Sequence, residues 1–427
     1  MRIVMPYGDT EQETAIAWGR CLGILDVANA PPLADIAQAT REALRRPIGM
    51  ERPALAGVRP GEKIVIVVSD AFRKTGIHEI LPTFLESLAE AGARDDDIAF
   101  LVATGSHRAP TAVEQGRILG EAVYRRFRAR AFVHDPVDTE NLVYMGRTSR
   151  GTPVSLNRRL VEADHVFVTG TVVLHYFGGF GGGRKSIVPG LAGIDTIAHN
   201  HALNLHPTED RLNPAVRIGV LDGNPLAEDM IEAARMCRVD CIINTVLNRD
   251  GAIAGLFVGE LDAAHRAAAG FARDLYAVQI NEKADLVVTS AGNAKNFIQS
   301  HKALFNGCQA LKPGGRMVFL AAAPEGLGGN KFMHWLGLGS RSAIIAELRK
   351  NAEINGQTAL STIEKSIITT FVTELSENEV SRMGGRKASD LGEALERVRA
   401  DLAAGGVADP TYYLMPSASY TVPTHDA

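Results

Sequence analysis

The densest group of reactive side chains lies in residues 174–201, which read LHYFGGFGGGRKSIVPGLAGIDTIAHNH. The glycine run in this segment ends in Arg184, Lys185 and Ser186. Glycine lets the backbone approach a ligand closely, and consecutive backbone N–H groups can bind an anion. The segment therefore predicts a ligand-binding loop. Its expected contact residues are Gly181, Gly182, Gly183 and Ser186.

This glycine loop resembles two nucleotide-binding motifs but matches neither. In G-x-x-x-x-G-K-[ST] the lysine follows the last glycine directly, whereas here Arg184 separates that glycine from Lys185. In G-x-G-x-x-G the third glycine would fall on Arg184 or Ser186. A flexible surface loop is the alternative, but the Lys-Ser pair and the closing Pro189-Gly190 favour a shaped anion site.

Three histidines next to predicted strands and helices are candidates for proton transfer or metal binding. His175 directly precedes the glycine loop, and His107 lies in the loop ATGSHRAPT. His201 is expected on a short helix that Asp195 caps. Imidazole titrates near neutral pH, and its neutral form is a common metal ligand. Each histidine taken alone is equally explained as a hydrogen-bonded structural residue, so their grouping carries the hypothesis.

The elements that position these residues are apolar strands alternating with helices. Such alternation predicts an α/β fold with mainly parallel sheets. Loops at the carboxyl ends of parallel strands gather functional residues. We therefore expect Asp70, Arg73, His107 and His175 to face one crevice. The predicted strands of this part are residues 63–68, 98–102, 131–134 and 165–168.

The same pattern predicts two α/β domains joined by a helix. Residues 260–278 read as one long helix, and new strands follow it, one of them after the turn Pro313-Gly314-Gly315. We predict an N-terminal cofactor-binding and catalytic domain at residues 1–270. A C-terminal domain at residues 271–427 is expected to contribute substrate contacts. In it, Gln299 and Lys302 lie one helical turn apart and share a face.

Composition and charge argue against several function classes. The 427 residues are 46% hydrophobic and 22% charged with a net charge of −4, as in ordinary globular proteins. This balance gives no electrostatic reason to expect nucleic acid or an anionic membrane as a partner. No apolar run suits a membrane span or a signal peptide. Four cysteines in so long a chain indicate a reducing compartment, so a cytoplasmic location is expected.

Together these segments resemble the nickel-dependent lactate racemase family. The resemblance runs from PYGDTEQE at residues 6–13 to PEGLGG at residues 324–329 and is densest at residues 174–201. It implies two α/β domains with the active site in the cleft between them. It also implies an isomerase, a racemase or epimerase of a 2-hydroxy acid that works by proton-coupled hydride transfer. The implied cofactor is a nickel pincer nucleotide, Ni(II)-pyridinium-3,5-bisthiocarboxylate mononucleotide.

The resemblance also implies a role for each matching residue. Lys185 would bond covalently to one arm of the cofactor, and His201 would bind the nickel. His107 and His175 would be the paired acid/bases. Arg73, Gln299 and Lys302 match substrate-binding residues, whereas Asp70, together with Arg73 and the glycine loop, belongs to the cofactor pocket.

The chemistry of 2-hydroxy acids makes this set of residues plausible. Removing hydride while deprotonating the hydroxyl avoids a carbanion next to the carboxylate, and the resulting 2-oxo acid can take hydride back on either face. The hydroxyl is then approached from two sides, which requires two bases. Imidazoles with a pKa of about 6.5 suit both directions. The expected partners are a small 2-hydroxy acid and the proteins that assemble the cofactor.

Some stretches depart from the family pattern and leave the substrate open. DAFRK stands where DxTRP is usual, so Phe72 replaces Thr and Lys74 replaces Pro. Residues 292–296, GNAKN, replace a GGxPxD-like segment. Lys74 offers a second cation for a larger or dicarboxylic hydroxy acid. The competing functions are a non-catalytic pincer-nucleotide binding protein and a phosphate-handling metalloenzyme without a lysine adduct.

Overall fold

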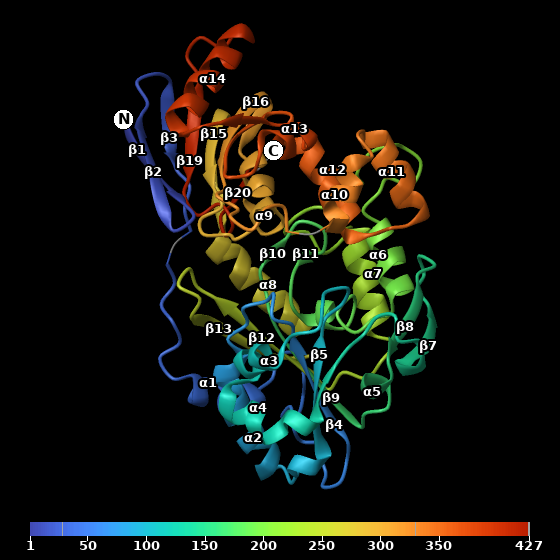
Figure 1. Ribbon diagram of the computed structural model, residues 1–427. Helices are drawn as coiled ribbons and strands as arrows, with labels where there is room; N and C mark the ends of the chain where they lie inside the picture. The colour runs from blue at the N-terminus through green and yellow to red at the C-terminus, as the bar shows by residue number, and fades with distance from the viewer. Residues whose placement is uncertain (28, 329, 426–427) are drawn as a thin grey trace. The chain divides into compact units, whose positions relative to one another are not determined.

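The computed structural model describes residues 1–27, 29–328 and 330–425, so Gly329 of the PEGLGG segment lies outside the described residues. The chain is a mixed α/β protein with mainly parallel sheets, which confirms the predicted fold class (Figure 1). It forms two compact units. The smaller unit comprises Met1–Ala28, Thr208–Arg211 and Tyr276–Ala427, and the larger comprises Asn29–Pro207 and Leu212–Leu275.

The sheet of the larger unit has the strand order β13-β12-β9-β4-β5-β6. All neighbours are parallel except β13, which pairs antiparallel with β12. Two further hairpins, β7–β8 and β10–β11, lie outside this sheet. The strands are β4 (Ile64–Ser69), β5 (Ile98–Ala103), β6 (Ala131–Val133), β7 (Leu142–Arg147), β8 (Pro153–Asn157), β9 (His165–Thr171), β10 (Leu174–His175), β11 (Gly179–Phe180), β12 (Cys241–Leu247) and β13 (Ile253–Gly259).

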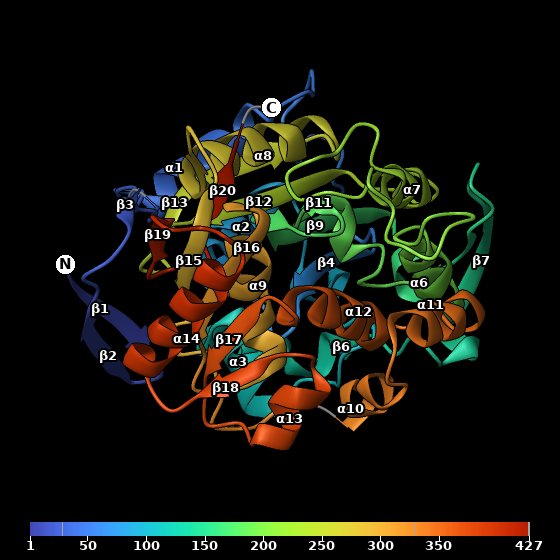
Figure 2. The same ribbon diagram turned by 90° about the horizontal axis from the view of Figure 1, so that it is seen from above.

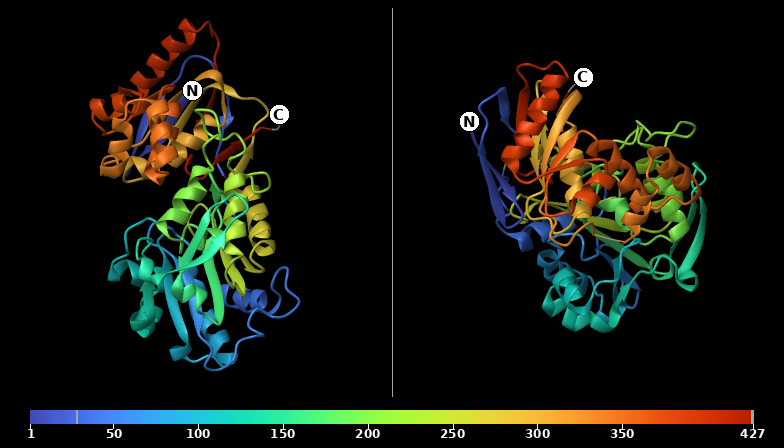
Figure 3. Two further views of the ribbon diagram at one scale, coloured as in Figure 1. Left: turned by 90° about the vertical axis from the view of Figure 1, so that its right-hand side faces the viewer. Right: turned by 45° about the horizontal axis from the view of Figure 1, so that its top comes forward.

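Both faces of this sheet are buried, which explains the unbroken apolar sequence of its strands. In β4, Ile66 and Val68 pack into one core with Phe84 of α2, whereas Val67 packs into a second core with Leu226 of α7. Alternate side chains of a strand point to opposite faces, so each face is covered by its own helices (Figures 1 and 3). The helices are α1 (Ile36–Arg45), α2 (Ile77–Glu90), α3 (Ala112–Leu119), α4 (Glu121–Phe127), α5 (Arg158–Val161), α6 (Ile194–Ala202), α7 (Pro225–Ala234) and α8 (Ala263–Tyr276).

The sheet of the smaller unit is parallel throughout, in the order β18-β17-β16-β15-β19-β3. The hairpin β1–β2 and helix α14 share one hydrophobic core with it, through Ile3, Val318 and Leu395 among others (Figure 2). The strands are β1 (Arg2–Tyr7), β2 (Thr10–Ala15), β3 (Arg20–Ile24), β14 (Ala277–Gln279), β15 (Ala284–Ser290), β16 (Leu311–Leu320), β17 (Thr369–Val372), β18 (Arg386–Ala388), β19 (Thr411–Met415) and β20 (Val422–Thr424).

Strand β3 changes the domain division expected from the sequence. It pairs with β19, and the buried Ile3 and Met5 belong to the core of the smaller unit. The prediction that all of residues 1–270 form one domain is therefore wrong for the first 27 residues, which join the C-terminal sheet. The pairing of β3 with β19 joins residues almost 400 positions apart, so no local sequence pattern predicts it.

Helices cover the other face of this sheet as well. Phe297 of α9 lies 6.2 Å from Phe371 of β17, and Phe319 of β16 lies 5.6 Å from the same ring, measured between centroids. The turn expected at residues 313–315 falls inside β16, where the pairing with β15 shifts register. The helices are α9 (Phe297–Cys308), α10 (Asn330–Gly337), α11 (Arg341–Lys350), α12 (Ile354–Ser366), α13 (Glu377–Arg382) and α14 (Leu391–Ala404).

Two properties apply to the described part of the chain as a whole. None of its helices combines the length and the apolar character needed to cross a membrane. Its four cysteines, Cys21, Cys237, Cys241 and Cys308, are free thiols.

Candidate functional site

The predicted catalytic loops leave the larger sheet at one edge. Asp70 directly follows β4, His107 follows β5, and His175 follows β9. These three strands are parallel neighbours in the order β9-β4-β5. Their carboxyl ends therefore meet at the same edge, as the sequence predicted.

Asp70 and His107 form the first pair of this site. Asp70 is 3% exposed, and its Oδ2 atom lies 2.6 Å from His107 Nδ1. Its Oδ1 atom accepts a hydrogen bond from the backbone N–H of Phe72 at 3.1 Å. Because a carboxylate oxygen can only accept, Nδ1 of His107 carries the proton, and Nε2 of the neutral ring carries the lone pair. His107 is thus oriented as a base on a partly exposed side chain.

His175 and Lys185 form the second pair. Backbone N–H groups of Phe177 and Gly178 each donate to His175 Nδ1 at 3.2 Å. The other ring nitrogen, Nε2, lies 2.9 Å from Lys185 Nζ. Since Nδ1 accepts, the neutral ring carries its proton on Nε2, and Nζ must accept that proton through a lone pair. This arrangement requires Lys185 to be a neutral amine.

The surroundings of Lys185 agree with an uncharged amine. Burial lowers its pKa well below the usual value, and the positive charges of Arg73 and Arg184 lower it further. A neutral lysine is the nucleophilic form that can make a covalent bond. Arg73, from the loop after β4, and Arg184, from the glycine loop, therefore both lower the pKa of Lys185.

His201 lies on α6, which begins after Gly193 rather than being capped by Asp195, a residue of its first turn. His201 is 3% exposed, and its Nδ1 atom lies 2.8 Å from the carbonyl oxygen of Ile197. Burial lowers its pKa to about 4. The ring is therefore neutral, with its proton on Nδ1 and the lone pair on Nε2, which is the form that binds a metal.

Arg184, the residue that breaks the nucleotide-binding motifs, points into the protein. It is 2% exposed, and its Nη2 atom donates to the carbonyl oxygen of Gly178 at 2.8 Å. Its Nη1 atom lies 3.1 Å from the ring of His265 on α8, and His265 Nε2 donates to the carbonyl oxygen of Gly181 at 2.8 Å. Burial lowers the pKa of Arg184 to about 10 and that of His265 to about 3. These two side chains brace the loop from inside.

The glycines of the loop are required by its shape. Gly182 and Gly183 both have positive φ, 72° and 50°. A Cβ atom at Gly182 would lie 2.7 Å from Val172 Cγ2, and one at Gly183 would lie 2.8 Å from the ring of His265. The loop is therefore a packed element and not a flexible surface segment.

The backbone N–H groups of the loop are partly used within the protein. Gly181 donates to the carbonyl oxygen of Val173 at 2.8 Å, and Gly183 donates to Asn244 Oδ1 at 3.1 Å. The hydroxyl of Ser186 donates to the carbonyl oxygen of Thr169. In this structure, these groups hold the loop on the strands instead of forming an open anion nest.

Asn244 is a residue of the site that the sequence analysis missed. It is fully buried in β12, and its Nδ2 atom has no hydrogen-bond partner in the described structure. An unpaired buried donor is costly, so such groups in native proteins commonly mark a ligand or a strained site. The available signal was a lone amide in the apolar strand CIINTVL.

The predicted substrate residues of the smaller unit lie on α9. Asn296 caps this helix by accepting from the backbone N–H of Gln299, whose own Oε1 atom accepts from the N–H of Lys295 at 3.1 Å. Lys302 Nζ lies 5.9 Å from the centroid of the Tyr420 ring. Both predicted residues therefore occupy one helix, one turn apart, as expected.

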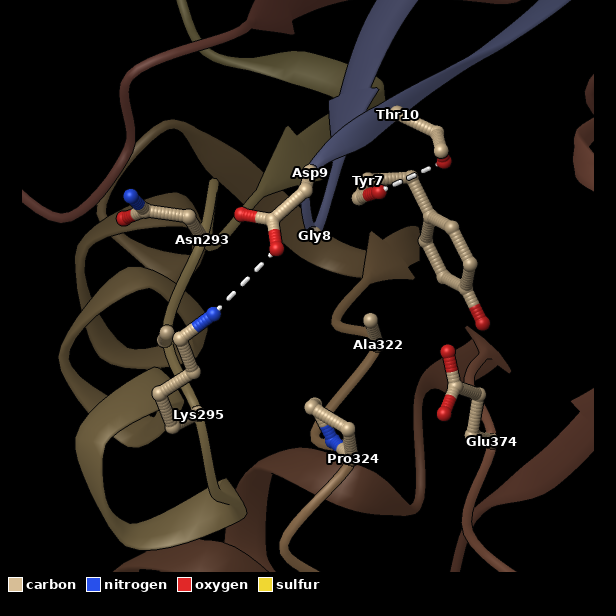
Figure 4. Close-up of a pocket in the computed structure, with 10 residues that line it drawn as sticks. Tyr7, Gly8, Asp9, Thr10, Asn293, Lys295, Ala322, Pro324 and Glu374 are labelled. Carbon is tan, nitrogen blue, oxygen red and sulfur yellow. Dashed lines mark hydrogen bonds and ion pairs between the residues drawn. The ribbon is translucent and has the colours of Figure 1, made fainter.

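A cavity of about 230 Å³ in the smaller unit brings three segments of the resemblance together (Figure 4). It lies at the carboxyl ends of β15, β16 and β17. Lys295 Nζ lies 3.4 Å from Asp9 Oδ2, and the hydroxyl of Tyr7 points toward Glu374. Burial, with the charge of Glu374, raises the pKa of Tyr7. Ala323, beside the cavity, has a φ of +52°, a sign of local backbone strain.

The described residues contain no group of three or more His, Cys, Asp or Glu side chains that could hold a metal ion.

Comparison with known proteins identifies the family. A curated lactate racemase from Thermoanaerobacterium thermosaccharolyticum is 32% identical over 339 residues, which span 78% of this chain and 77% of that protein. The chain belongs to the lactate racemase family. A second curated lactate racemase, from Lactiplantibacillus plantarum, is 33% identical over 301 residues, with 70% and 68% coverage. The sequence model of the lactate racemase N-terminal domain matches residues 7–212.

Solved structures place the fold in the same family. The lactate racemase apoprotein of Thermoanaerobacterium thermosaccharolyticum matches with a TM-score of 0.87 and 28% identity, covering 99% of this chain and all of that one. A Thermotoga maritima protein shares the fold with a TM-score of 0.65 at 17% identity. The resemblance found in the sequence is thus confirmed, and lactate racemases are isomerases.

Proposed function

We propose that this member of the lactate racemase family racemises or epimerises a 2-hydroxy acid of the lactate class with a nickel pincer nucleotide attached to Lys185. The observation that carries the proposal is the contact between Lys185 Nζ and His175 Nε2 at 2.9 Å. It joins the amine that would anchor the cofactor to a histidine that would transfer a proton. Kinship with two lactate racemases supports the reaction class.

The residues at the carboxyl edge of the sheet fit such a cofactor. Lys185 is held as a nucleophilic amine, and His201 offers Nε2 as a metal ligand because its Nδ1 is fixed by Ile197. The unpaired Nδ2 atom of Asn244 is a donor that lies under the loop carrying Lys185. When bound, the nickel pincer nucleotide supplies a hydride acceptor for the C2–H of the substrate.

His107 would take the hydroxyl proton of one enantiomer at Nε2. The imidazolium that forms would keep its Nδ1–H hydrogen-bonded to Asp70 Oδ2, 2.6 Å away. The carboxylate therefore both fixes the ring and stabilises its charged form. Asp70, which the resemblance assigned to the cofactor pocket, would act on the proton transfer as well.

His175 would serve the opposite enantiomer once Lys185 has been modified. Acylation turns Nζ into an amide nitrogen, which no longer has a lone pair to accept the Nε2 proton. The hydrogen bond seen here could not persist in that form, so the Nε2–H of His175 would be free to donate to the substrate oxygen. Taking the hydroxyl proton at Nε2 would require the other tautomer of the ring, with its proton on Nδ1. Tyr176 stacks on His175 with ring centroids 4.9 Å apart and keeps the imidazole in place.

A substrate carboxylate requires cations near the two histidines. Arg73 is exposed three residues after the buried Asp70, and a guanidinium binds a carboxylate through two parallel hydrogen bonds. We propose Arg73, Gln299 and Lys302 as the substrate-binding residues. Cofactor-assembly proteins are the proposed partners, and the four free thiols suit the reducing cytoplasm.

Mass spectrometry and chiral analysis of the same preparation test the proposal. We expect protein produced with the cofactor-assembly machinery to contain nickel, to show a mass increase on the Lys185 peptide, and to racemise single-enantiomer lactate without added nicotinamide. The Lys185→Arg variant should lack the adduct. An active wild-type enzyme with unmodified Lys185 would refute the covalent attachment, whereas loaded protein without turnover would favour a non-catalytic binding protein.

A further inference from the structure

Phe72 is an unusual phenylalanine in this protein. Of the 15 phenylalanines, all of which lie in the described part of the chain, it alone is exposed, with 48% of its surface accessible. A single exposed apolar residue needs no explanation by itself. The neighbours of Phe72 are what make its exposure informative.

The phenyl ring of Phe72 packs against the proposed base. Its centroid lies 4.9 Å from that of the His107 ring, with a tilt of 56°. One carboxylate fixes both residues, because Asp70 accepts from the Phe72 backbone through Oδ1 and from the His107 ring through Oδ2. The imidazole and the phenyl ring are therefore held side by side at a set spacing.

This spacing restricts what a substrate can place beside His107. Nδ1 of His107 is engaged by Asp70, so a substrate hydroxyl would meet Nε2. Because the two ring centroids are 4.9 Å apart, a side chain on the same carbon can reach the phenyl ring. A methyl group is too small to cover such a ring, whereas a larger apolar group would remove it from water.

We infer that the substrate is a 2-hydroxy acid whose side chain is apolar and larger than methyl, and that this side chain packs against Phe72. The inference rests on the proposed function and adds the substrate class.

The surroundings of Phe72 suit a second carboxylate on the substrate less well than an apolar side chain. Arg108 lies over the phenyl ring, with its Cζ 5.2 Å from the ring centroid. Glu114 binds its guanidinium through two hydrogen bonds of 2.7 and 2.6 Å, so its charge is already balanced. Lys74 is exposed and could serve a second carboxylate, which makes that substrate an outcome of the test.

The test compares specificity among three L-2-hydroxy acids with cofactor-loaded enzyme. Chiral chromatography gives kcat/KM for lactate, 3-phenyllactate and malate. We expect 3-phenyllactate to exceed lactate by about 10-fold or more, since each methylene in an apolar pocket contributes roughly that factor. Phe72→Ala should lower the phenyllactate-to-lactate ratio by about 10-fold or more, whereas Phe72→Tyr should keep it within about threefold. Tyr144→Ala, an exposed aromatic on β7, is the matched control.

The outcomes separate this inference from the proposed function. Preference of the wild type for lactate or malate would overturn it, and so would an equal fall of both rates in Phe72→Ala, which would make Phe72 a positioning residue for His107. If loaded enzyme turns over none of the three acids while Lys185 carries the adduct, the proposed function itself fails.

Discussion

Two histidine–carboxylate pairs lie at opposite edges of the larger sheet and differ in how the imidazole is used. At the carboxyl edge, His107 has one carboxylate partner, Asp70, on Nδ1. At the amino edge, both ring nitrogens of His165 face carboxylate oxygens, Asp240 at 3.0 Å and Glu62 at 2.8 Å. The same residue type therefore serves two purposes.

Exposure follows the same division. The His107 side chain is 35% exposed and the His165 side chain is 4% exposed. A ring with both nitrogens bonded to the protein cannot exchange a proton with a ligand without breaking a hydrogen bond. Engagement of Nε2 by a protein carboxylate, more than the presence of a carboxylate on Nδ1, separates the structural His165 from His107, the proposed acid/base.

The largest expected effect is the loss of activity at the carboxyl edge. His107→Ala should lower kcat/KM for racemisation by about 10³-fold, because general acid–base groups contribute about 10² to 10⁴. Nickel content and the urea midpoint should stay close to those of the wild type, since His107 is partly exposed. Wild-type activity in this variant would end the two-base scheme.

The next effect is on stability at the amino edge. His165→Ala should lower the free energy of unfolding by about 2–3 kcal/mol, because it leaves the carboxylates of Asp240 and Glu62 without their buried partner. Urea denaturation followed by circular dichroism measures it. Below the unfolding range the loaded variant should racemise as well as the wild type, and a selective loss of kcat would show that the two edges are coupled.

The smallest effect is the pH dependence of that amino-edge pair. Burial opposes ionisation of Asp240, but hydrogen bonds from Arg238, Val166 and His165 outweigh it and lower its pKa below 3.8. A carboxyl with a lowered pKa in the folded state stabilises the protein above its unfolded pKa, and this contribution is lost as the pH falls through the folded value. Asp240→Asn should therefore reduce the acid sensitivity of the urea midpoint below about pH 4. An unchanged acid limb would exclude this carboxyl as a contributor.

The sequence predicted those features of the site that depend on which residues directly follow a strand. Apolar strands predicted the parallel sheet, and the residues after them predicted that Asp70 and His107 would meet. These features arise from local patterns, which the order of residues records directly.

Features that depend on side-chain direction or on distant pairing could not be read from the sequence. Arg184 served only to break a motif, yet it is buried against His265, 81 residues away. Asn244 and the β3–β19 pairing likewise depend on contacts across the fold. The two carboxylate contacts of His165 could not be predicted either, because Glu62 precedes β4 whereas Asp240 precedes β12.

The brace formed by Arg184 decides how a group attached to the next residue can behave. Arg184 ties Gly178 to His265, and His265 holds Gly181, so the two halves of the loop and helix α8 are linked as one body. Carrier proteins move a covalently bound group between separate active sites on a long, mobile tether. A group joined to Lys185 would have no such reach and would stay where it was installed, so the reactants must come to it.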